Sequence, residues 1–262
     1  MNKKHYLSKV GLLGCILLLS SIISSCKKET PAAQQPKAED ENASSIAYFI
    51  KKGYKAEDIV VKDGKFIIQT DIVISREDVE ARIKNEGASG SPQTEHWRSN
   101  YIIADPYHKN VRLYIEPTVT AQWKTAVQGA IANWNNMPGQ GTTIELGMSI
   151  TTSTTAYDTR VFMGYENANW IARAYLPASS GKPGVSIEIN SKYNTMSASQ
   201  KLFAITHELG HTIGFMHTNQ TSGVFIPGTP SVDANSVMNS FVLPWAGFTA
   251  GDALATSVLY PN

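Results

Sequence analysis

The sequence predicts an α+β fold, and three observations support this prediction. Short runs of alternating apolar residues predict strands at 111–115, 144–150 and 184–190. Apolar residues at helical spacing predict an amphipathic helix over 120–136. A second helix is expected to begin near Ser197 and to carry histidines near its end. We therefore expect a sheet with helices packed against it.

Residues 1–26 are expected to lie outside this fold. Three lysines precede an apolar run from Gly11 to Ile23, which is short for a bilayer span. The pattern predicts a secretory signal peptide. Its end, Ile23-Ser24-Ser25-Cys26, resembles a bacterial lipobox, which implies cleavage before Cys26 and acylation of its thiol. The alternative is an uncleaved anchor helix with an incidental cysteine, and both interpretations tether an exported chain to a membrane.

Cysteine usage and charge narrow the possible functions further. Cys15 and Cys26 are the two cysteines of the chain, so the exported part would have no disulfide. Loss of residues 1–26 removes three lysines and no acidic residue, which leaves 20 basic and 22 acidic residues. This balance gives no reason to expect a nucleic-acid partner.

The remaining chain divides into three predicted parts. A polar stretch with proline and alanine predicts a disordered tether over 27–45. A small N-terminal unit and linker are expected over 46–92, with a hairpin turn at Asp63-Gly64 and a helix capped by Ser75. The larger domain is expected over 93–262.

The most specific pattern is the string HELGHTIGFMH in the larger domain. His207 and His211 are four residues apart, so a helix places both imidazoles on one face. Gly214 can adopt the left-handed conformation that ends a helix, and the chain can then return His217 to the same point. Glu208 flanks that point. Three neutral imidazoles around Zn²⁺ leave a fourth position for water, which is typical of a catalytic site.

This string resembles the zinc-binding consensus of the metzincin metallopeptidases. Downstream, residues 236–239 (SVMN) resemble the Met-turn, in which Met238 would form an apolar floor under the histidines. The segment 245–261 resembles the closing helix of the bacterial HEIGH-type metallopeptidases, with Leu209 in place of the isoleucine in that name. The resemblance covers about residues 95–262 and implies a metzincin-like catalytic domain, with a twisted mixed sheet, a zinc-binding helix and a C-terminal subdomain.

The resemblance also implies a mechanism. One Zn²⁺ per chain, bound by the three histidines of the string, would activate a water, and Glu208 would act as general base. The resemblance implies that strand 184–190 is an edge strand that pairs with extended substrate. His96 and His108 are interpreted as surface residues. Calcium is common in the superfamily, but no acidic cluster here is sharp enough to assign a calcium site.

Ahead of the catalytic domain, the string Ile68-Gln69-Thr70-Asp71 invites a further hypothesis. In the astacin branch of metzincins, a pro-segment aspartate in a Phe-x-Gly-Asp motif ligates the zinc. Only Asp71 matches that motif here, so the alternative is an ordinary polar residue at a strand end. As a hypothesis, Asp71 is a zinc switch.

The sequence as a whole predicts an exported, lipid-anchored zinc endopeptidase of the bacterial cell envelope, at the outer membrane or cell surface. Its expected partners are a protein or peptide substrate and, through lipid on Cys26, a membrane, and we expect a monomer. Two alternatives stay open. One is a catalytically inactive binding or adhesin lipoprotein that keeps the fold, and the other is a zinc amidase that acts on cell-wall peptides.

Overall fold

The computed structural model describes residues 41–85, 96–220, 223–230 and 233–262. Residues Asp40–Asn262 form one compact unit. The predicted signal peptide, Cys26 and most of the predicted tether and linker lie outside the described residues. Among the described residues, no helix has the length and apolar character needed to cross a membrane.

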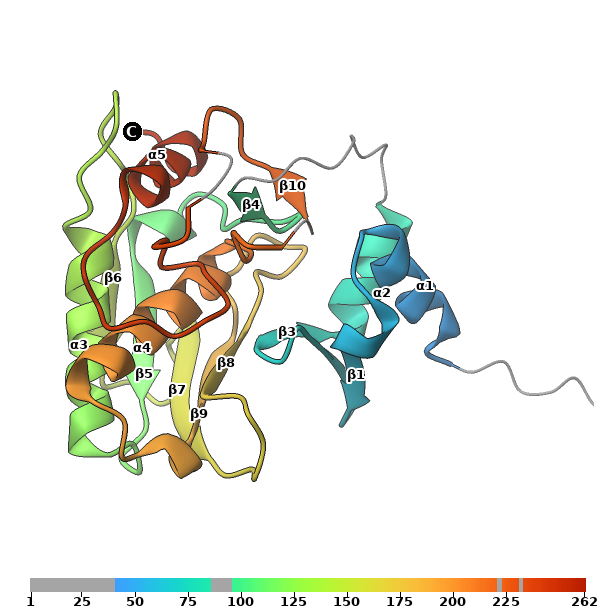
Figure 1. The fold of residues 1–262 in the computed structure, drawn as a ribbon, viewed down its shortest axis with the longest axis horizontal. Helices are drawn as coiled ribbons and strands as arrows, with labels where there is room; N and C mark the ends of the chain where they lie inside the picture. Colours follow the sequence, from blue (N-terminus) through green and yellow to red (C-terminus); the bar gives the residue numbers. More distant parts are fainter. Residues whose placement is uncertain (1–40, 86–95, 221–222, 231–232) are drawn as a thin grey trace, which may run out of the picture. The chain divides into compact units, whose positions relative to one another are not determined.

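Eight strands form one mixed sheet in the order β1-β2-β3-β8-β9-β7-β5-β6 (Figure 1). They are β1 Ile59–Lys62, β2 Lys65–Ile68, β3 Ile72–Ser75, β5 Val111–Ile115, β6 Met148–Thr151, β7 Thr159–Gly164, β8 Ala172–Tyr175 and β9 Ser186–Asn190. Strands β6, β5, β7 and β9 run parallel to one another. Strand β8 is antiparallel to β9, and β3 pairs with β8 in parallel. The N-terminal strands therefore extend the sheet of the larger domain.

The N-terminal unit consists of strands β1, β2 and β3 together with three helices. These are α1 (Ala43–Lys51), a 3-10 helix (Ala56–Asp58) and α2 (Arg76–Lys84). The predicted Asp63-Gly64 turn joins β1 to β2, and both of its residues have positive φ. Ser75 caps α2 by accepting a hydrogen bond from the backbone N–H of Asp78. Helix α1 begins inside the stretch that was predicted to be a tether.

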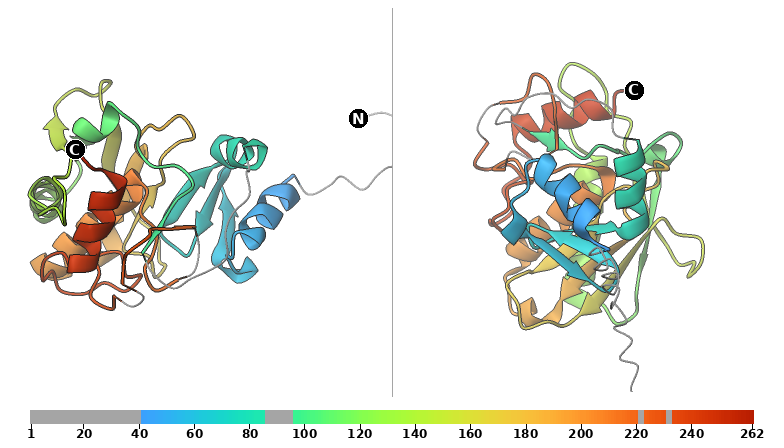
Figure 2. Two further views of the ribbon diagram at one scale, coloured as in Figure 1. Left: turned by 90° about the horizontal axis from the view of Figure 1, so that it is seen from above. Right: turned by 90° about the vertical axis from the view of Figure 1, so that its right-hand side faces the viewer.

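Two long helices, α3 (Ala121–Asn135) and α4 (Ala198–Ile213), pack against each other and against the sheet (Figure 1 and Figure 2). Trp123 and Trp134 of α3 are buried in the core, as expected from their helical spacing. The Trp134 indole donates a hydrogen bond to the Thr206 carbonyl of α4, 2.9 Å away. This contact fixes α4 relative to α3.

The C-terminal part packs beyond the end of α4. The short strand β10 (Val224–Phe225) pairs with β4 (Trp97–Arg98), and α5 (Ala250–Leu259) closes the chain. Thr249 caps α5 by accepting a hydrogen bond from the backbone N–H of Asp252. Two 3-10 helices, Tyr107–Lys109 and Ser191–Tyr193, complete the described elements.

Two expectations about the larger domain are wrong, and one of its strands was not predicted. Strand β9 lies between β7 and β8, so the predicted 184–190 edge strand is internal. The strand next to the N-terminal unit is instead β8, which was not predicted because four residues are too few to give a clear strand pattern. The predicted strand 144–150 shrinks to β6, with Ile144 forming an isolated bridge to Pro261.

Candidate metal centre

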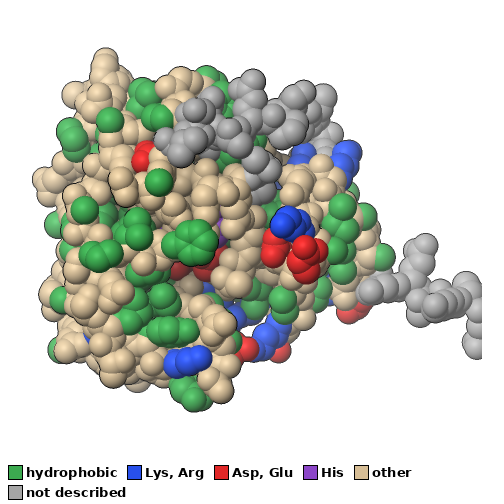
Figure 3. All heavy atoms as spheres, in the orientation of Figure 1, with side chains coloured by type: hydrophobic (Ala, Val, Ile, Leu, Met, Phe, Trp, Pro, Cys, Tyr) green, Lys and Arg blue, Asp and Glu red, His purple; other side chains and the backbone are tan. Residues whose placement is uncertain are grey.

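Helix α4 places the first two histidines. Its N-terminus is a capping box, in which the Ser197 hydroxyl and the Gln200 side chain each accept a backbone hydrogen bond from the other residue. His207 and His211 follow on the buried part of the helix and are 5% and 0% exposed. In the space-filling view very little histidine surface is visible on the face that is shown (Figure 3).

Gly214 ends α4 and allows the third histidine to return. Its φ of +113° lies in the left-handed region, which glycine adopts at little cost. After this turn His217 faces the first two histidines and is fully buried. The predicted convergence of the three imidazoles is therefore present in the structure.

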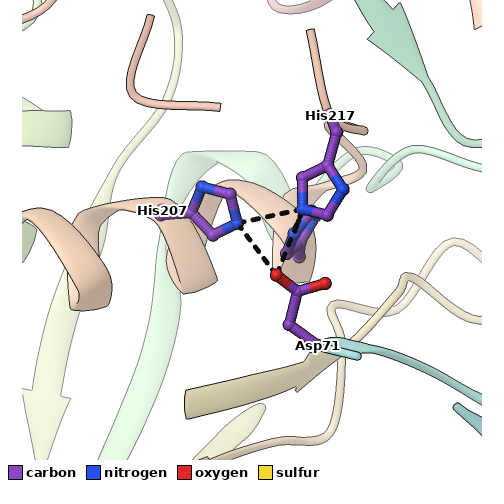
Figure 4. A group of neighbouring side chains, drawn as sticks. Asp71, His207 and His217 are labelled. Atoms are coloured by element: carbon purple, nitrogen blue, oxygen red, sulfur yellow. Dashed lines mark hydrogen bonds and ion pairs between the residues drawn. The ribbon is translucent and has the colours of Figure 1, made fainter. Parts of the chain in front are cut away.

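The facing nitrogens lie close together. His217 Nε2 is 3.2 Å from His211 Nε2 and 3.3 Å from His207 Nε2. Asp71 completes the group, with its Oδ2 atom 3.2 Å from His217 Nε2 and 3.6 Å from His207 Nε2 (Figure 4). Zn–N and Zn–O bonds of about 2.0–2.1 Å in a tetrahedral site place neighbouring donor atoms about 3.3 Å apart. The spacing therefore fits one zinc ion.

The hydrogen-bond partner of Nδ1, the outer nitrogen of each ring, indicates which ring nitrogen carries the proton. His207 Nδ1 lies 2.7 Å from the Val237 carbonyl, and His211 Nδ1 lies 2.8 Å from the Phe215 carbonyl. Because a carbonyl oxygen can only accept, both Nδ1 atoms carry the proton and donate. In a neutral ring Nε2 then presents a lone pair. Burial lowers the pKa of His211 well below its ordinary value, which favours the neutral ring.

Lone pairs that face each other at this distance repel unless a cation lies between them. The donor set of three imidazoles and one carboxylate is one that zinc prefers. The residues therefore fit the metal on the chemistry of their donor atoms.

Asp71 enters the group from the N-terminal unit. Burial by itself would raise its pKa, but the close contacts with the imidazoles of His207 and His217 outweigh burial and hold the pKa well below its ordinary value. Its second oxygen, Oδ1, is buried and has no hydrogen-bond partner among the described residues. The structure thus brings Asp71 to the histidines, as the switch hypothesis requires, and its role is taken up below.

Glu208 lies beside the group without joining it. Its side chain is 3% exposed, and its Oε2 atom is buried without a partner among the described residues. Burial, together with the charge of Asp71, raises the pKa of Glu208 well above its ordinary value. A buried carboxylate with an unused oxygen at a metal centre is a candidate proton acceptor.

The predicted Met-turn lies directly under the histidines. Met238 is 1% exposed and packs against Gly210 of α4, where a side chain would overlap the Met238 sulfur. The turn also supplies the Val237 carbonyl that holds His207. Its other end is fixed by α5, because Asp252 accepts hydrogen bonds from the Ser236 hydroxyl and the Val237 N–H.

His96 is a correction to the sequence analysis. It is 1% exposed rather than at the surface, and its Nε2 atom lies 3.3 Å from Asp252 Oδ1. His108 is half-buried and contacts the Glu145 carbonyl. The contact between His96 and Asp252 was not expected from the sequence. A second unexpected contact joins Gln69 to His217 Nδ1, at 3.1 Å. In each contact the two residues are far apart in the sequence, so no local pattern could have revealed it.

A cleft of about 230 Å³ opens beside the metal centre. Its walls come from four places: the 69–71 loop, the entry to β8, α4 and the segment after the Met-turn. They are Thr70, Asp71, Asn169, Trp170, Ile171, Ala172, Ala204, His207, Glu208, Asn239, Ser240, Phe241 and Val242. The cleft is the space in which a substrate could reach Glu208.

The fold and the donor set together define a zinc metallopeptidase. Comparison with known families supports this class: a family model described as dual-action HEIGH metallo-peptidase matches residues 66–260. The chain belongs to this metallopeptidase family. The match begins within β2, so it includes the loop that carries Asp71.

Solved structures show a distant likeness to this chain. High choriolytic enzyme 1, a hatching enzyme zinc-protease from Oryzias latipes (Medaka fish), is 15% identical, with a TM-score of 0.41 over 61% of this chain and 93% of that chain. Two structures of myroilysin are each 13% identical and cover 59% of this chain, with 85% and 81% of theirs, at TM-scores of 0.42 and 0.41. No curated protein matches the sequence.

Proposed function

We propose that this protein is an exported, lipid-anchored zinc endopeptidase. The single observation that carries the catalytic part is the convergence of three imidazole Nε2 atoms beside the buried Glu208. His207, His211 and His217 would hold the zinc ion. Its substrate is a protein or peptide, as the metallopeptidase family implies.

The proposed chemistry assigns one role to each group. Zinc, when bound, supplies a Lewis acid that lowers the pKa of water and polarises a carbonyl. Glu208 accepts a proton from the attacking water and delivers it to the leaving amine nitrogen, so that the peptide C–N bond breaks. No side chain forms a covalent bond to the substrate. Gly214 and Met238 keep the three imidazoles in place.

The test of this chemistry compares the wild-type chain with Glu208→Gln on a casein-like substrate, with and without a chelator. Loss of a general base predicts a rate reduced by about 10²–10⁴-fold in the variant. Zinc binding without any cleavage, in the wild type and in Asp71→Ala alike, would favour the inactive adhesin alternative. Cleavage of cell-wall peptides but not of proteins would favour the amidase alternative. Activity that resists both chelator and substitution would reject the mechanism.

The export and anchoring parts of the proposal rest on residues 1–26. The apolar run and the sequence Ile23-Ser24-Ser25-Cys26 support acylation of Cys26 at the cell envelope. Metabolic labelling of the cells with a fatty acid should label the wild-type protein but not Cys26→Ser. A wild-type protein without lipid would remove the anchor from the proposal.

Asp71 is proposed to keep the enzyme latent. Its contacts with His207 and His217 place a carboxylate where the fourth zinc ligand would lie. Strand β3, which follows Asp71, pairs with β8 at the wall of the cleft and so restricts access of an extended substrate. If Asp71 is a switch, Asp71→Ala should raise the peptidase activity of the full-length chain. Unchanged activity would leave Asp71 as an ordinary strand-end residue.

A further inference from the structure

The three histidines differ in the origin of the group that holds the outer nitrogen of each ring. For His207 and His211 this group is a backbone carbonyl of the larger domain. For His217 it is the side chain of Gln69, whose Oε1 atom lies 3.1 Å from Nδ1. Gln69 belongs to the N-terminal unit, so one of the three outer contacts comes from outside the larger domain.

The chemistry fixes the direction of this contact. His217 Nε2 faces the other two imidazoles and Asp71, so it must be the unprotonated nitrogen if it is to bind a metal. The proton of a neutral ring then resides on Nδ1, which donates to the amide oxygen of Gln69. A hydrogen-bond acceptor at this position fixes the tautomer and orientation of the ring and increases its basicity as a ligand.

The loop that carries Gln69 is held firmly. It connects β2 to β3 through Gln69, Thr70 and Asp71, between the paired residues Ile68 and Ile72, both of which are fully buried. The Gln69 N–H donates to the Asp58 carbonyl, and the Asp71 carbonyl accepts from Ala174 of β8.

The loop backbone is strained at two consecutive residues. Gln69 and Thr70 have φ values of 54° and 78°, in the left-handed region that non-glycine residues seldom adopt. A strained backbone that persists near a site indicates that surrounding contacts enforce it. Here the result is that Gln69 and Asp71 contact opposite nitrogens of the same ring, His217.

We propose that Gln69 is a positioning residue of the zinc site, so that the N-terminal unit strengthens zinc binding as well as blocking the site. This inference rests on the proposed zinc-binding role of the three histidines. It predicts that the latent form holds zinc more tightly than a form in which Gln69 has left His217.

Two substitutions at the same position test the proposal in the full-length chain. Gln69→Leu keeps the size of the side chain but removes the acceptor, whereas Gln69→Glu keeps an acceptor. Both retain a side chain at the same positive φ, so backbone strain is common to the pair. Zinc affinity is measured by competition with a chromophoric chelator, and the metal-free thermal midpoint reports folding. Lys55→Gln, an exposed substitution in the same unit, serves as the control.

Loss of an outer hydrogen-bond partner of a metal ligand lowers metal affinity by about 10–100-fold. We expect a loss of this size for Gln69→Leu, and affinity at or above the wild-type level for Gln69→Glu and Lys55→Gln. If Gln69→Leu fails to fold, Gln69→Ala takes its place. Equal zinc affinity in the wild type and Gln69→Leu, or an equal loss in Gln69→Leu and Gln69→Glu, would overturn the inference. A wild-type chain that binds no zinc would instead overturn the proposed function itself.

Discussion

Two clusters of histidine and carboxylate side chains lie within the described part of the chain, and only one of them looks like a metal site. The first joins Asp71 to the three histidines of the string HELGHTIGFMH. The second joins His96 to Asp233 and Asp252. In both clusters the candidate donor atoms lie within 4.8 Å of one another, so distance alone does not separate them.

The difference lies in the supply of hydrogen-bond donors. Asp252 accepts from the Ser236 hydroxyl at 2.6 Å, from the Thr249 N–H at 3.0 Å and from the Val237 N–H at 3.1 Å. Asp233 accepts from the Thr249 hydroxyl at 2.6 Å. The oxygens of the second cluster are therefore satisfied by protein groups, as buried carboxylates require.

In the first cluster the facing atoms are acceptors. The Nδ1 protons of His207 and His211 point away to backbone carbonyls, and Asp71 contributes another acceptor. Such a cluster is stable only with a cation, whereas the second is stable as a hydrogen-bonded clamp between α5 and the Met-turn. The comparison teaches that the location of the protons, more than residue type or spacing, distinguishes a metal site from a structural one.

The largest expected effect comes from breaking the first cluster. His211→Ala removes one of the three histidines proposed to bind zinc, so zinc binding and peptidase activity should both fall to background. Because the metal-free cluster is repulsive, the stability of the metal-free protein should change much less than its zinc affinity. Metal content after dialysis, with a proteolysis assay, provides the measurement.

The matched control is His96→Ala in the second cluster. We expect it to retain one zinc per chain, and titration of the wild type should also saturate at one. Two zinc ions per wild-type chain, with one lost in His96→Ala, would contradict the distinction between the clusters.

Asp252→Ala should produce the largest loss of stability in the second cluster. The substitution leaves His96, Ser236 and two backbone N–H groups without their acceptor. Breaking a buried, hydrogen-bonded charge network costs about 3–5 kcal/mol. Denaturant unfolding of the metal-free protein measures the loss, with Glu80→Ala on the exposed surface of α2 as control. A loss no larger than that of the control would mean that the cluster is not a clamp.

The pKa of the same carboxylate predicts that the free energy of unfolding decreases at low pH, in an acid limb of the curve of stability against pH. Burial would raise the pKa of Asp252, but hydrogen bonds from His96, Ser236 and Thr249 outweigh it and lower the pKa below the ordinary value of 3.8. A lowered folded-state pKa contributes stability above pH 3.8 that is lost as the pH falls through the folded value. Asp252→Asn should flatten this limb. An unchanged slope of unfolding free energy against pH below 3.8 would assign the limb to other groups.

Ser236→Ala should have an intermediate effect. Its hydroxyl donates to Asp252 and accepts from the Met238 N–H, so it joins the clamp to the Met-turn. A hydrogen bond to a charged group contributes about 1.5–3 kcal/mol. We expect a stability loss in this range, measured by denaturant unfolding, and a smaller one for Ser236→Thr, which keeps the hydroxyl. Equal losses in the two variants would point to packing rather than hydrogen bonding.

Much of the site could be predicted from sequence because its parts are local. His207 and His211 share one turn of α4, and Gly214 marks the end of that helix, so spacing alone predicts their arrangement. The capping Ser197 and the Asp63-Gly64 turn are likewise short-range signals. Strand β5 was predicted with its observed bounds because apolar residues recur at alternate positions of its sequence.

The remaining parts depend on pairings between distant segments. Strand β8 is only four residues long, and its position next to β3 follows from tertiary packing. The error over the 184–190 strand has the same origin, because alternation predicts a strand but not its neighbours. Gln69 and His217 are 148 positions apart, so their contact leaves no periodic signal.

Met238→Leu should have the smallest effect, and it tests what the Met-turn supplies to the metal centre. Met238 is buried against Gly210 of α4. If its contribution is apolar packing, a side chain of similar volume should replace it at a cost below about 1.5 kcal/mol, with zinc affinity close to the wild-type value. Met238→Ala leaves a cavity and should cost about 2–5 kcal/mol. Unfolding and chelator competition measure both variants. A large loss of zinc affinity in Met238→Leu, with stability retained, would instead assign the sulfur atom a specific role beneath the histidines.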